Sequence, residues 1–163
     1  MQYRIGQGYD FHKLIDERQF ILGGVKISFD KGIEGHSDGD LLIHAIVDSI
    51  LGGLSLGDIG TYFPSNNEEW ENKDSSFFLK HAIELVESKN HFISNIDCTI
   101  ILQNPQINQY IEAMKANLSE LLKVSIDRIS IKATTTDKLG FIGRGDGIGC
   151  MAICLLYAND EVH

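Results

Sequence analysis

The sequence predicts an α+β fold in which helices cover one face of a mixed sheet of four to five strands. Strand patterning opens the chain, amphipathic helical patterns alternate with strands in its middle, and an apolar strand ends it. The order ββααβαββ combines neighbouring strands with helical crossovers, which is typical of a mixed sheet. The other face of the sheet would stay bare, so we expect an assembly to cover it.

Five stretches carry the patterning of strands. Two of them open the chain, at residues 3–9 and 20–29. The stretch 95–103 is rich in β-branched residues, and 128–134 leads into a glycine-rich loop. The apolar stretch 148–157 supplies the last strand. The sheet is therefore expected to combine segments from both ends of the chain.

Three helices are predicted between these strands by apolar residues at helical spacing. Ser37 or Asp38 can cap the first helix, which a pair of glycines ends. The second helix spans residues 75–89. The third follows Pro105 and continues to about residue 122.

We treat residues 1–163 as a single domain, because a chain of this length builds one core and is too short to divide comfortably into two. Charged residues make up 23% of the chain and hydrophobic residues 43%, as in globular proteins. Residues 57–74 are rich in Gly, Asn and acids and lack a sustained period, so we interpret them as a long loop. Loops of this length are often functional.

The formal net charge of -9 argues against nucleic acid or an anionic membrane as a partner, because both require basic surface. A small phosphorylated substrate remains compatible with it, since a bound divalent cation reverses the local field in a pocket. The opening residues MQYRIGQGYD lack the order of a signal peptide, and no apolar run approaches the ~20 residues that span a bilayer. We expect a cytoplasmic protein.

The cysteines fit the same compartment. Cys98, Cys150 and Cys154 cannot all pair, and three cysteines do not resemble a disulfide framework. Cys150 and Cys154 lie four apart in an apolar stretch, which favours small buried hydrophobic residues over metal ligands.

Histidines and carboxylates gather at two places. Asp10 and His12 are two apart at the end of a predicted strand, so both side chains point to one side of the sheet. Asp40 and His44 lie one helical turn apart, and His36 precedes that helix near its positive end. Two imidazoles and a carboxylate are a common set for a catalytic zinc site.

A single histidine more often has a structural role than a ligand role, and the spacing alone does not decide between them. Asp10, His12 and His44 are favoured as a set because His44 interrupts an otherwise apolar helix stripe, and a buried imidazole needs a partner. His81, His91 and His163 lack such a signal.

The segment TTTDKLG follows a predicted strand and sets three threonine hydroxyls beside Asp137. This composition can donate hydrogen bonds to phosphate while the carboxylate holds Mg²⁺, although strand propensity and capping also explain a threonine run. The glycines of GRGDGIG match neither common nucleotide-binding loop. Arg144 there can pair with a phosphate or with Asp146 of a neighbour.

Five motifs extend over nearly the whole chain, and together they resemble the 2-C-methyl-D-erythritol 2,4-cyclodiphosphate synthase family. Each motif alone is weak, whereas five in the right order and at the right separation are specific. The motifs are GQGYDFH (6–12), GHSDGDLLIHA (35–45), GDIGTYFP (57–64), IKATTTDKLGF (131–141) and GRGDGIG (143–149).

The resemblance implies a homotrimer whose sheets pack around a central axis, with active sites at the subunit boundaries. It implies a lyase of the non-mevalonate pathway of isoprenoid precursors, which cyclises 4-diphosphocytidyl-2-C-methyl-D-erythritol 2-phosphate and releases CMP. The nucleophile is already an anionic phosphate oxygen, so catalysis is expected to consist of metal-assisted positioning and charge neutralisation.

The resemblance also implies roles for individual residues. Asp10, His12 and His44 would bind Zn²⁺, while His36 and Thr135 would stabilise the transition state. Asp10, His12, His36 and Ser37 would also contact the substrate. The methylerythritol end would lie against the residues Asp58, Ile59, Gly60, Phe63, Pro64, Ser65, Asn66 and Asn67.

The cytidine diphosphate would be cradled by an adjoining subunit, and Phe141 and Arg144 would line the remaining substrate or axial cavity. The cradle consists of Leu102, Gln103, Asn104, Pro105, Gln106, Ile107, Asn108, Ala133 and Thr134. Thr135, Thr136 and Asp137 would also contact the substrate, with Asp137 holding Mg²⁺ or Mn²⁺ on the diphosphate.

The chain departs from the family pattern at three places. Asp137 stands where the family usually has Glu, so its carboxylate sits one methylene short. FPSNN (63–67) lacks the acids that usually follow FP, and Gln106 replaces a frequent Lys.

Two other functions use the same residues. A zinc hydrolase would use the three ligands to activate water, but it lacks a clear general base. A non-catalytic module would bind a nucleotide or isoprenoid diphosphate, and degraded ligands would favour it. The chain keeps all three candidate ligands, and it also keeps His36 and Thr135.

Overall fold

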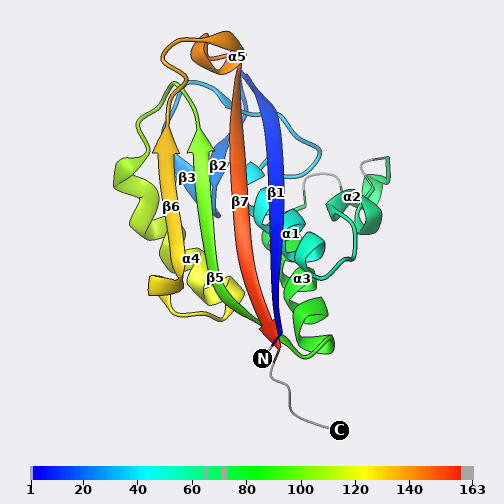
Figure 1. Ribbon diagram of the computed structural model, residues 1–163. Coiled ribbons are helices and arrows are strands. Elements are labelled where there is room, and N and C mark those ends of the chain that lie inside the picture. The colour runs from blue at the N-terminus through cyan, green and yellow to red at the C-terminus, as the bar shows by residue number, and fades with distance from the viewer. Residues whose placement is uncertain (1, 65, 71–72, 159–163) are drawn as a thin grey trace, which may run out of the picture.

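A five-stranded mixed sheet forms the centre of the computed structural model, which describes residues 2–64, 66–70 and 73–158 (Figure 1). The strand order is β4-β1-β7-β5-β6, and β5 and β6 run parallel whereas the other neighbouring strands are antiparallel. A separate hairpin pairs β2 with β3. The strands are β1 (Gln2–Ile15), β2 (Phe20–Leu22), β3 (Val25–Ile27), β4 (Gly32–Ile33), β5 (His91–Ile101), β6 (Ile129–Thr134) and β7 (Gly147–Ala158).

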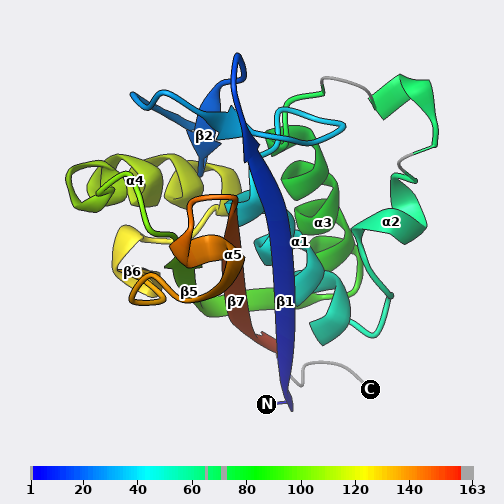
Figure 2. The ribbon, with the colours of Figure 1, turned by 90° about the horizontal axis from the view of Figure 1, so that it is seen from above.

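Three long helices lie on one face of this sheet, as Figures 1 and 2 show. They are α1 (Leu41–Gly53), α3 (Ser76–Ser88) and α4 (Ile111–Leu122). Two single-turn helices, α2 (Ile59–Tyr62) and α5 (Gly140–Gly143), lie beyond the β1 edge and at one end of the sheet. The mixed sheet with helices on one face confirms the predicted architecture. Short 3₁₀ turns are η1 (Glu68–Trp70), η2 (Asn108–Tyr110) and η3 (Ile126–Arg128).

Alternation along the strands separates a buried face from an open one. Every second residue of β7, from Ile148 to Leu156, is fully buried against the helices. The alternate positions of β1 face the other way, and Ile5 is 73% exposed there. Tyr9 and Phe11 lie on the same face and remain about half exposed. Burying one side chain of this size is worth about 1.5–3 kcal/mol, so this face is costly to leave in water.

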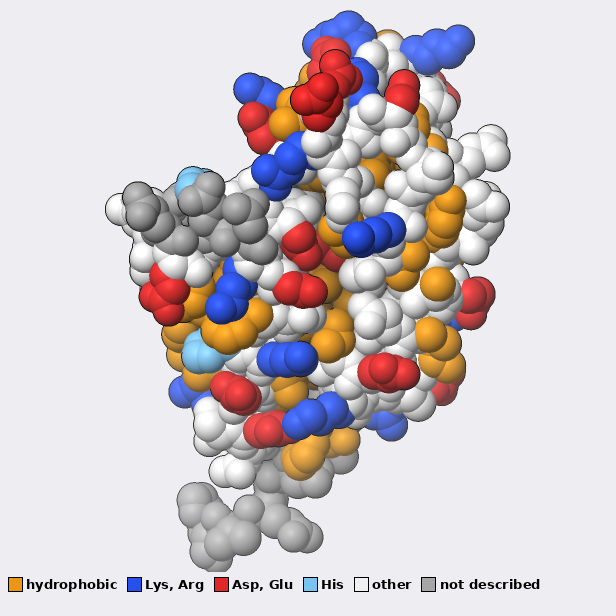
Figure 3. Space-filling model, turned by 180° about the vertical axis from the view of Figure 1, so that it is seen from behind, with side chains coloured by type: hydrophobic (Ala, Val, Ile, Leu, Met, Phe, Trp, Pro, Cys, Tyr) orange, Lys and Arg blue, Asp and Glu red, His pale blue; other side chains and the backbone are white. Residues whose placement is uncertain are grey.

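The surface on the helix side of the molecule carries charged side chains of both signs (Figure 3). Figure 3 shows acidic and basic side chains interspersed over the part of the chain that the structure describes. Within residues 2–64, 66–70 and 73–158, no helix has both the length and the apolar character needed to cross a membrane.

Two glycines bring β1 and α1 into backbone contact. A Cβ atom at Gly8 would lie 2.1 Å from the carbonyl oxygen of Ala45, and one at Gly6 would lie 1.7 Å from that of Ser49. Neither backbone oxygen can move without shifting the helix. The close approach places His44 of α1 beside the strand that carries Asp10.

Gly8→Ala is therefore expected to lower the free energy of unfolding by about 3 kcal/mol or more, because the new methyl group overpacks the contact between β1 and α1. The Gly52→Ala variant is the matched control. Its Cβ would lie 3.8 Å from the Gln7 carbonyl oxygen, an ordinary contact, and alanine suits a helix. Urea denaturation of both variants checks the prediction, which equal stabilities would contradict.

The first helix begins later than predicted. Asp40, rather than Ser37 or Asp38, is its cap and accepts a hydrogen bond from the Ile43 N–H at 3.2 Å. The same carboxylate accepts the N–H groups of Gly23 at 2.9 Å and Gly24 at 2.6 Å. These bonds fix the β2–β3 turn to the start of α1, although complete burial raises the pKa of Asp40 to about 6.

Three other boundaries differ from the prediction. Residues 57–74 are not a continuous loop, because α2 and η1 lie within them. The third helix starts at Ile111 rather than directly after Pro105, and η2 precedes it. The strand predicted at 20–29 is a hairpin of two strands whose turn is Gly23-Gly24.

Candidate functional site

Asp10, His12 and His44 converge on one point, as predicted for this set. Oδ2 of Asp10 lies 2.8 Å from Nε2 of His12 and 3.0 Å from Nδ1 of His44. One ligand atom from each residue lies within 4.8 Å of the others, which suits a metal ion. Asp10 and His12 come from alternate positions of β1 that face the helices, and His44 comes from the facing turn of α1.

The outward-facing nitrogens of both imidazoles have partners. Nδ1 of His12 donates to the carbonyl oxygen of Glu34, so Nε2 is the nitrogen that faces the cluster and is left to bind a metal. Nε2 of His44 lies 2.9 Å from Oγ of Ser75 and 3.1 Å from Oγ of Ser37. Metal-binding histidines are usually held in this way, so the donor set fits the zinc ion that the sequence predicts.

The three side chains also influence one another's ionisation. Burial acts to raise the pKa of Asp10, but the hydrogen bonds and charges of His12 and His44 outweigh burial and hold this pKa well below its usual value. Burial lowers the pKa of His12, and the neighbouring Asp10 carboxylate more than offsets that effect, so the pKa is raised. The cluster is thus built around an ionised carboxylate, which is the form that binds cations.

Asp48 is a residue that the sequence argument missed. It lies one helical turn beyond His44 on α1, and its carboxylate accepts the N–H of Ile59 at 2.7 Å. Burial, together with the charge of Asp58, raises the pKa of Asp48. The i,i+4 spacing from His44 was the available signal. Asp48 thereby ties α2 to the helix that carries a candidate metal ligand.

Of the residues predicted to contact the methylerythritol end, some are exposed and others pack against the core. Asp58 caps α2 by accepting the N–H and hydroxyl of Thr61, both at 2.9 Å. Ile59 is half-buried, whereas Gly60, Pro64 and Asn66 are exposed, and the Asn67 side chain accepts the N–H of Glu69. Ser65 lies outside the described residues.

Phe63 belongs to an aromatic cluster rather than standing free beside the metal ligands. Its ring centroid lies 4.8 Å from that of Phe78, 5.1 Å from that of Trp70 and 5.3 Å from that of His81. Phe63 is half-buried against the core. Its immediate effect is to anchor the segment that follows α2.

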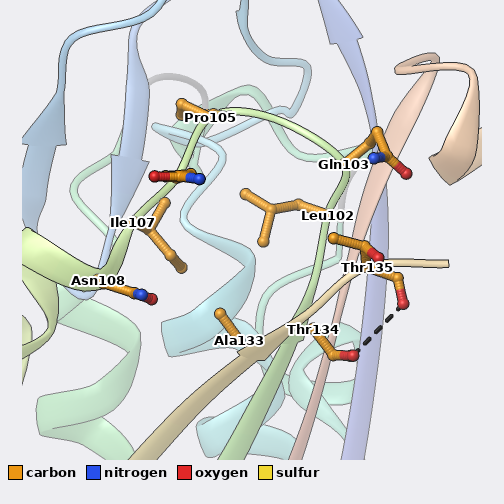
Figure 4. Close-up of a pocket in the computed structure, with 9 residues that line it drawn as sticks. Leu102, Gln103, Pro105, Ile107, Asn108, Ala133, Thr134 and Thr135 are labelled. Carbon is orange, nitrogen blue, oxygen red and sulfur yellow. Dashed lines mark hydrogen bonds between the residues drawn. The ribbon is translucent and has the colours of Figure 1, made fainter. Parts of the chain in front are cut away.

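A second site lies between the ends of β5 and β6. It is a pocket of about 130 Å³, and Figure 4 shows the side chains around it. The pocket is lined by the residues of the predicted cytidine cradle, except that Asn104 does not line it and Thr135 does. The lining residues are Leu102, Gln103, Pro105, Gln106, Ile107, Asn108, Ala133, Thr134 and Thr135.

The threonine run turns sharply after the pocket. Asp137 has a left-handed backbone with φ of 50°, and its carboxylate accepts the Thr135 hydroxyl at 3.3 Å. The Thr136 hydroxyl donates to the carbonyl oxygen of Leu139 at 2.7 Å. Asp137 is exposed and lies two residues after Thr135, which lines the pocket.

His36 is exposed on the loop before α1. The guanidinium group of Arg18 holds that loop, donating to the carbonyl oxygens of Gly35 and Ser37 at 2.9 Å each. The peptide units on both sides of His36 are therefore fixed while its side chain stays accessible.

Phe141 and Arg144 lie on and just after α5, near the open face of the sheet. Phe141 makes an edge contact with Phe11, their ring centroids 6.4 Å apart. Nε of Arg144 donates to the carboxylate of Asp146 at 2.9 Å. Of the two partners inferred from the sequence, a phosphate and the Asp146 carboxylate, the carboxylate is bound, and it belongs to the same chain.

The metal cluster and the pocket lie at one level of the sheet but toward opposite edges. Asp10 pairs with Cys150, Cys150 with Ile100, and Ile100 with Ala133. Three strand spacings of sheet, about 14 Å, therefore separate β1 from β6. Figure 1 shows α2 beyond β1 and the free edge of β6 on the other side.

Comparison with known proteins decides the family. Residues 3–157 match the YgbB family. The chain belongs to this family. The matched range includes all five motifs and confirms the resemblance inferred from them. A single pair of histidines could not have established this family.

Members of the family resemble this chain over nearly its full length. A 2-C-methyl-D-erythritol 2,4-cyclodiphosphate synthase of Clostridioides difficile (strain 630) is 55% identical over 158 residues, which are 97% of this chain and 98% of that one. The CDP complex of IspF from Plasmodium falciparum has a TM-score of 0.85 at 42% identity, with 97% of each chain covered. The bifunctional IspDF from Campylobacter jejuni has a TM-score of 0.94 at 37% identity. That match covers 98% of this chain and 43% of the other.

Proposed function

We propose that the chain is a lyase of the non-mevalonate isoprenoid pathway. It converts 4-diphosphocytidyl-2-C-methyl-D-erythritol 2-phosphate to 2-C-methyl-D-erythritol 2,4-cyclodiphosphate and releases CMP. The observation that carries the proposal is the Asp10, His12 and His44 cluster, at the level of the pocket between β5 and β6, in a chain 55% identical to a synthase of that name.

The reaction needs no protein nucleophile. An oxygen of the 2-phosphate attacks the β-phosphorus of the diphosphate and forms a new P–O bond. The bond from that phosphorus to the bridging oxygen breaks, and CMP leaves with the electron pair. Since attacking and leaving groups are anions, the barrier is dominated by their repulsion and by their alignment.

The chain's side chains supply positioning and charge. Asp10, His12 and His44 would hold Zn²⁺, and Asp137 would meet Mg²⁺ or Mn²⁺ on the diphosphate. When bound, these cations neutralise phosphate charge and fix the attacking and leaving oxygens in line. Asp137 is one methylene shorter than the Glu of the family pattern, so it would reach the second cation directly or through one water.

The pocket between β5 and β6 would bind the cytidine diphosphate. Ile107 and Leu102 give it an apolar lining, and Thr134 and Thr135 bring hydroxyl groups to its margin. This assignment is supported by the solved relative, which is a CDP complex. The Thr135 hydroxyl and the exposed His36 would donate to the phosphates as charge builds in the transition state.

A homotrimer would complete the site. The metal cluster lies on β1 and α1, whereas the pocket lies between β5 and β6 toward the other edge of the same sheet, so a substrate of this size would be held between two copies. Packing three sheets around one axis would also cover the open face that carries Ile5, Tyr9 and Phe11. Catalysis and assembly would then depend on the same surfaces.

The cytoplasm is the proposed location. Cys98, Cys150 and Cys154 are all free thiols and are buried, which suits a reducing compartment. Burial raises the pKa of Cys98 to about 12, so this thiol stays protonated and unreactive.

Incubation of the purified chain with the cytidylyl substrate, Zn²⁺ and Mg²⁺ tests the function directly. Phosphorus NMR should show CMP and a cyclic diphosphate appearing together in equal amounts. A linear product would point to the hydrolase, and binding without turnover would point to the non-catalytic module. Either result would overturn the proposal.

A further inference from the structure

Ser75 stands at the amino end of α3, where a serine hydroxyl normally accepts a hydrogen bond from the first helical turn. Its side chain makes no such bond. The hydroxyl is fully buried and lies between the carboxylate of Asp38 and the imidazole of His44. The side chain that would cap the helix is thus engaged with a candidate metal ligand.

The direction of each hydrogen bond follows from the groups available. The Asp38 carboxylate can only accept, and its two oxygens take the hydroxyl and the backbone N–H of Ser75, the latter at 3.1 Å. Because Ser75 has donated its one hydroxyl proton, its oxygen must accept from Nε2 of His44 at 2.9 Å. Nε2 therefore carries a proton, and Nδ1 of His44, 3.0 Å from Oδ2 of Asp10, is the nitrogen left to bind a metal.

We propose that Asp38 and Ser75 form an outer-sphere relay that fixes the tautomer and orientation of His44 and thereby sets the affinity of the cluster for its metal. Both are positioning residues. The relay is the counterpart of the Glu34 carbonyl group that holds His12. It rests on the proposed metal site and deepens it by adding two residues that do not touch the metal.

Neighbouring bonds hold the relay in place. The backbone N–H of Asp38 donates to the carbonyl oxygen of Lys73 at 3.1 Å, and that of Asp40 donates to the Asp38 carboxylate at 3.1 Å. The loops before α1 and α3 are therefore joined at the relay. Ser37 offers His44 a second acceptor at 3.1 Å, which would soften the loss of Ser75.

Zinc affinity of the metal-free protein, measured by competition with a chelator, tests the relay without reference to turnover. Ser75→Ala should raise the dissociation constant about ten-fold, and the Ser37→Ala, Ser75→Ala double variant about a hundred-fold. Asp38→Asn should weaken binding by a factor similar to Ser75→Ala. Combining Asp38→Asn with Ser75→Ala should weaken zinc binding little further than either substitution alone, because both break the same series of hydrogen bonds. The Ser75→Thr variant keeps the hydroxyl and should restore most of the affinity.

Ser49→Ala is the matched control. It removes an equally buried hydroxyl, which donates to the Ile46 carbonyl oxygen on α1 away from the cluster. If Ser75→Ala binds zinc as Ser49→Ala does and merely unfolds more easily, the hydroxyl is structural and the relay is wrong. If Ser75→Ala does not fold, Asp38→Asn decides by the same criterion. Unchanged zinc binding in His44→Ala would instead contradict the metal site itself, and the proposed function that depends on this site.

Discussion

His44→Ala is expected to abolish metal-dependent CMP release while the chain stays folded. The substitution removes one of three candidate ligands, whose atoms lie within 4.8 Å of one another. Loss of several kcal/mol of charge stabilisation corresponds to a rate lower by on the order of a thousand-fold. Alanine is a good helix former, and only the imidazole is lost from α1, so the fold should survive.

The control for this prediction is His91→Ala. His91 begins β5 at the end of the sheet remote from Asp10, and its Nδ1 donates to the Lys89 carbonyl oxygen at 2.7 Å. CMP release from this variant, assayed with and without a chelator, should match that of the parent chain. Full activity of His44→Ala after chelation would contradict the role assigned to the cluster.

Mixing two inactive variants should restore turnover, because in the proposed homotrimer the metal cluster and the pocket of one active site would come from different copies. Asp10→Ala damages the first half, and Thr134→Ala damages the second. If equal amounts of the two subunits exchange freely, each site has one chance in two of an intact cluster and one in two of an intact pocket. About a quarter of the sites should therefore be active.

A second mixture makes this test specific. Asp10→Ala combined with His44→Ala places both lesions in the same half of the site, so no pairing of copies regenerates an intact cluster. This mixture should stay inactive at every ratio. Rates of CMP release across both mixing series show whether one active site is built from two copies. No recovery in the first series would mean that each chain builds its site alone.

Much of the fold could be predicted because burial repeats with the period of each element. The strand ending the chain alternates regularly, and both of its ends are correct to within one residue. The first strand was predicted at residues 3–9. It continues to Ile15 because β7 pairs with it as far as Lys13 and β4 pairs with its last two residues.

Boundaries set by distant contacts could not be predicted. Asp40 caps the first helix because a hairpin turn some sixteen residues earlier also donates to its carboxylate, which no local pattern reveals. Phe63 was assigned to the substrate from its motif alone, whereas its aromatic partners depend on how α2 folds against α3. Ser75 fits a helix cap by sequence, and only the structure reveals its bond to His44.

The candidate cluster was predictable for a simple reason. Asp10 and His12 share a face of one strand, and His44 interrupts an apolar helix stripe, so two local patterns each pointed inward. Their meeting depends on the close contact at Gly6 and Gly8, which spacing does not encode. Asp48 escaped notice because its partner is a backbone N–H of another segment.

The central claim is that a substrate phosphate, and not water, attacks the diphosphate. Running the reaction in water labelled with heavy oxygen, followed by mass spectrometry of both products, tests this most directly. The cyclisation predicts that neither CMP nor the cyclic diphosphate carries the label, because no water enters either new bond. One labelled oxygen in either product, formed in step with turnover, would contradict the account and identify a metal-dependent hydrolase.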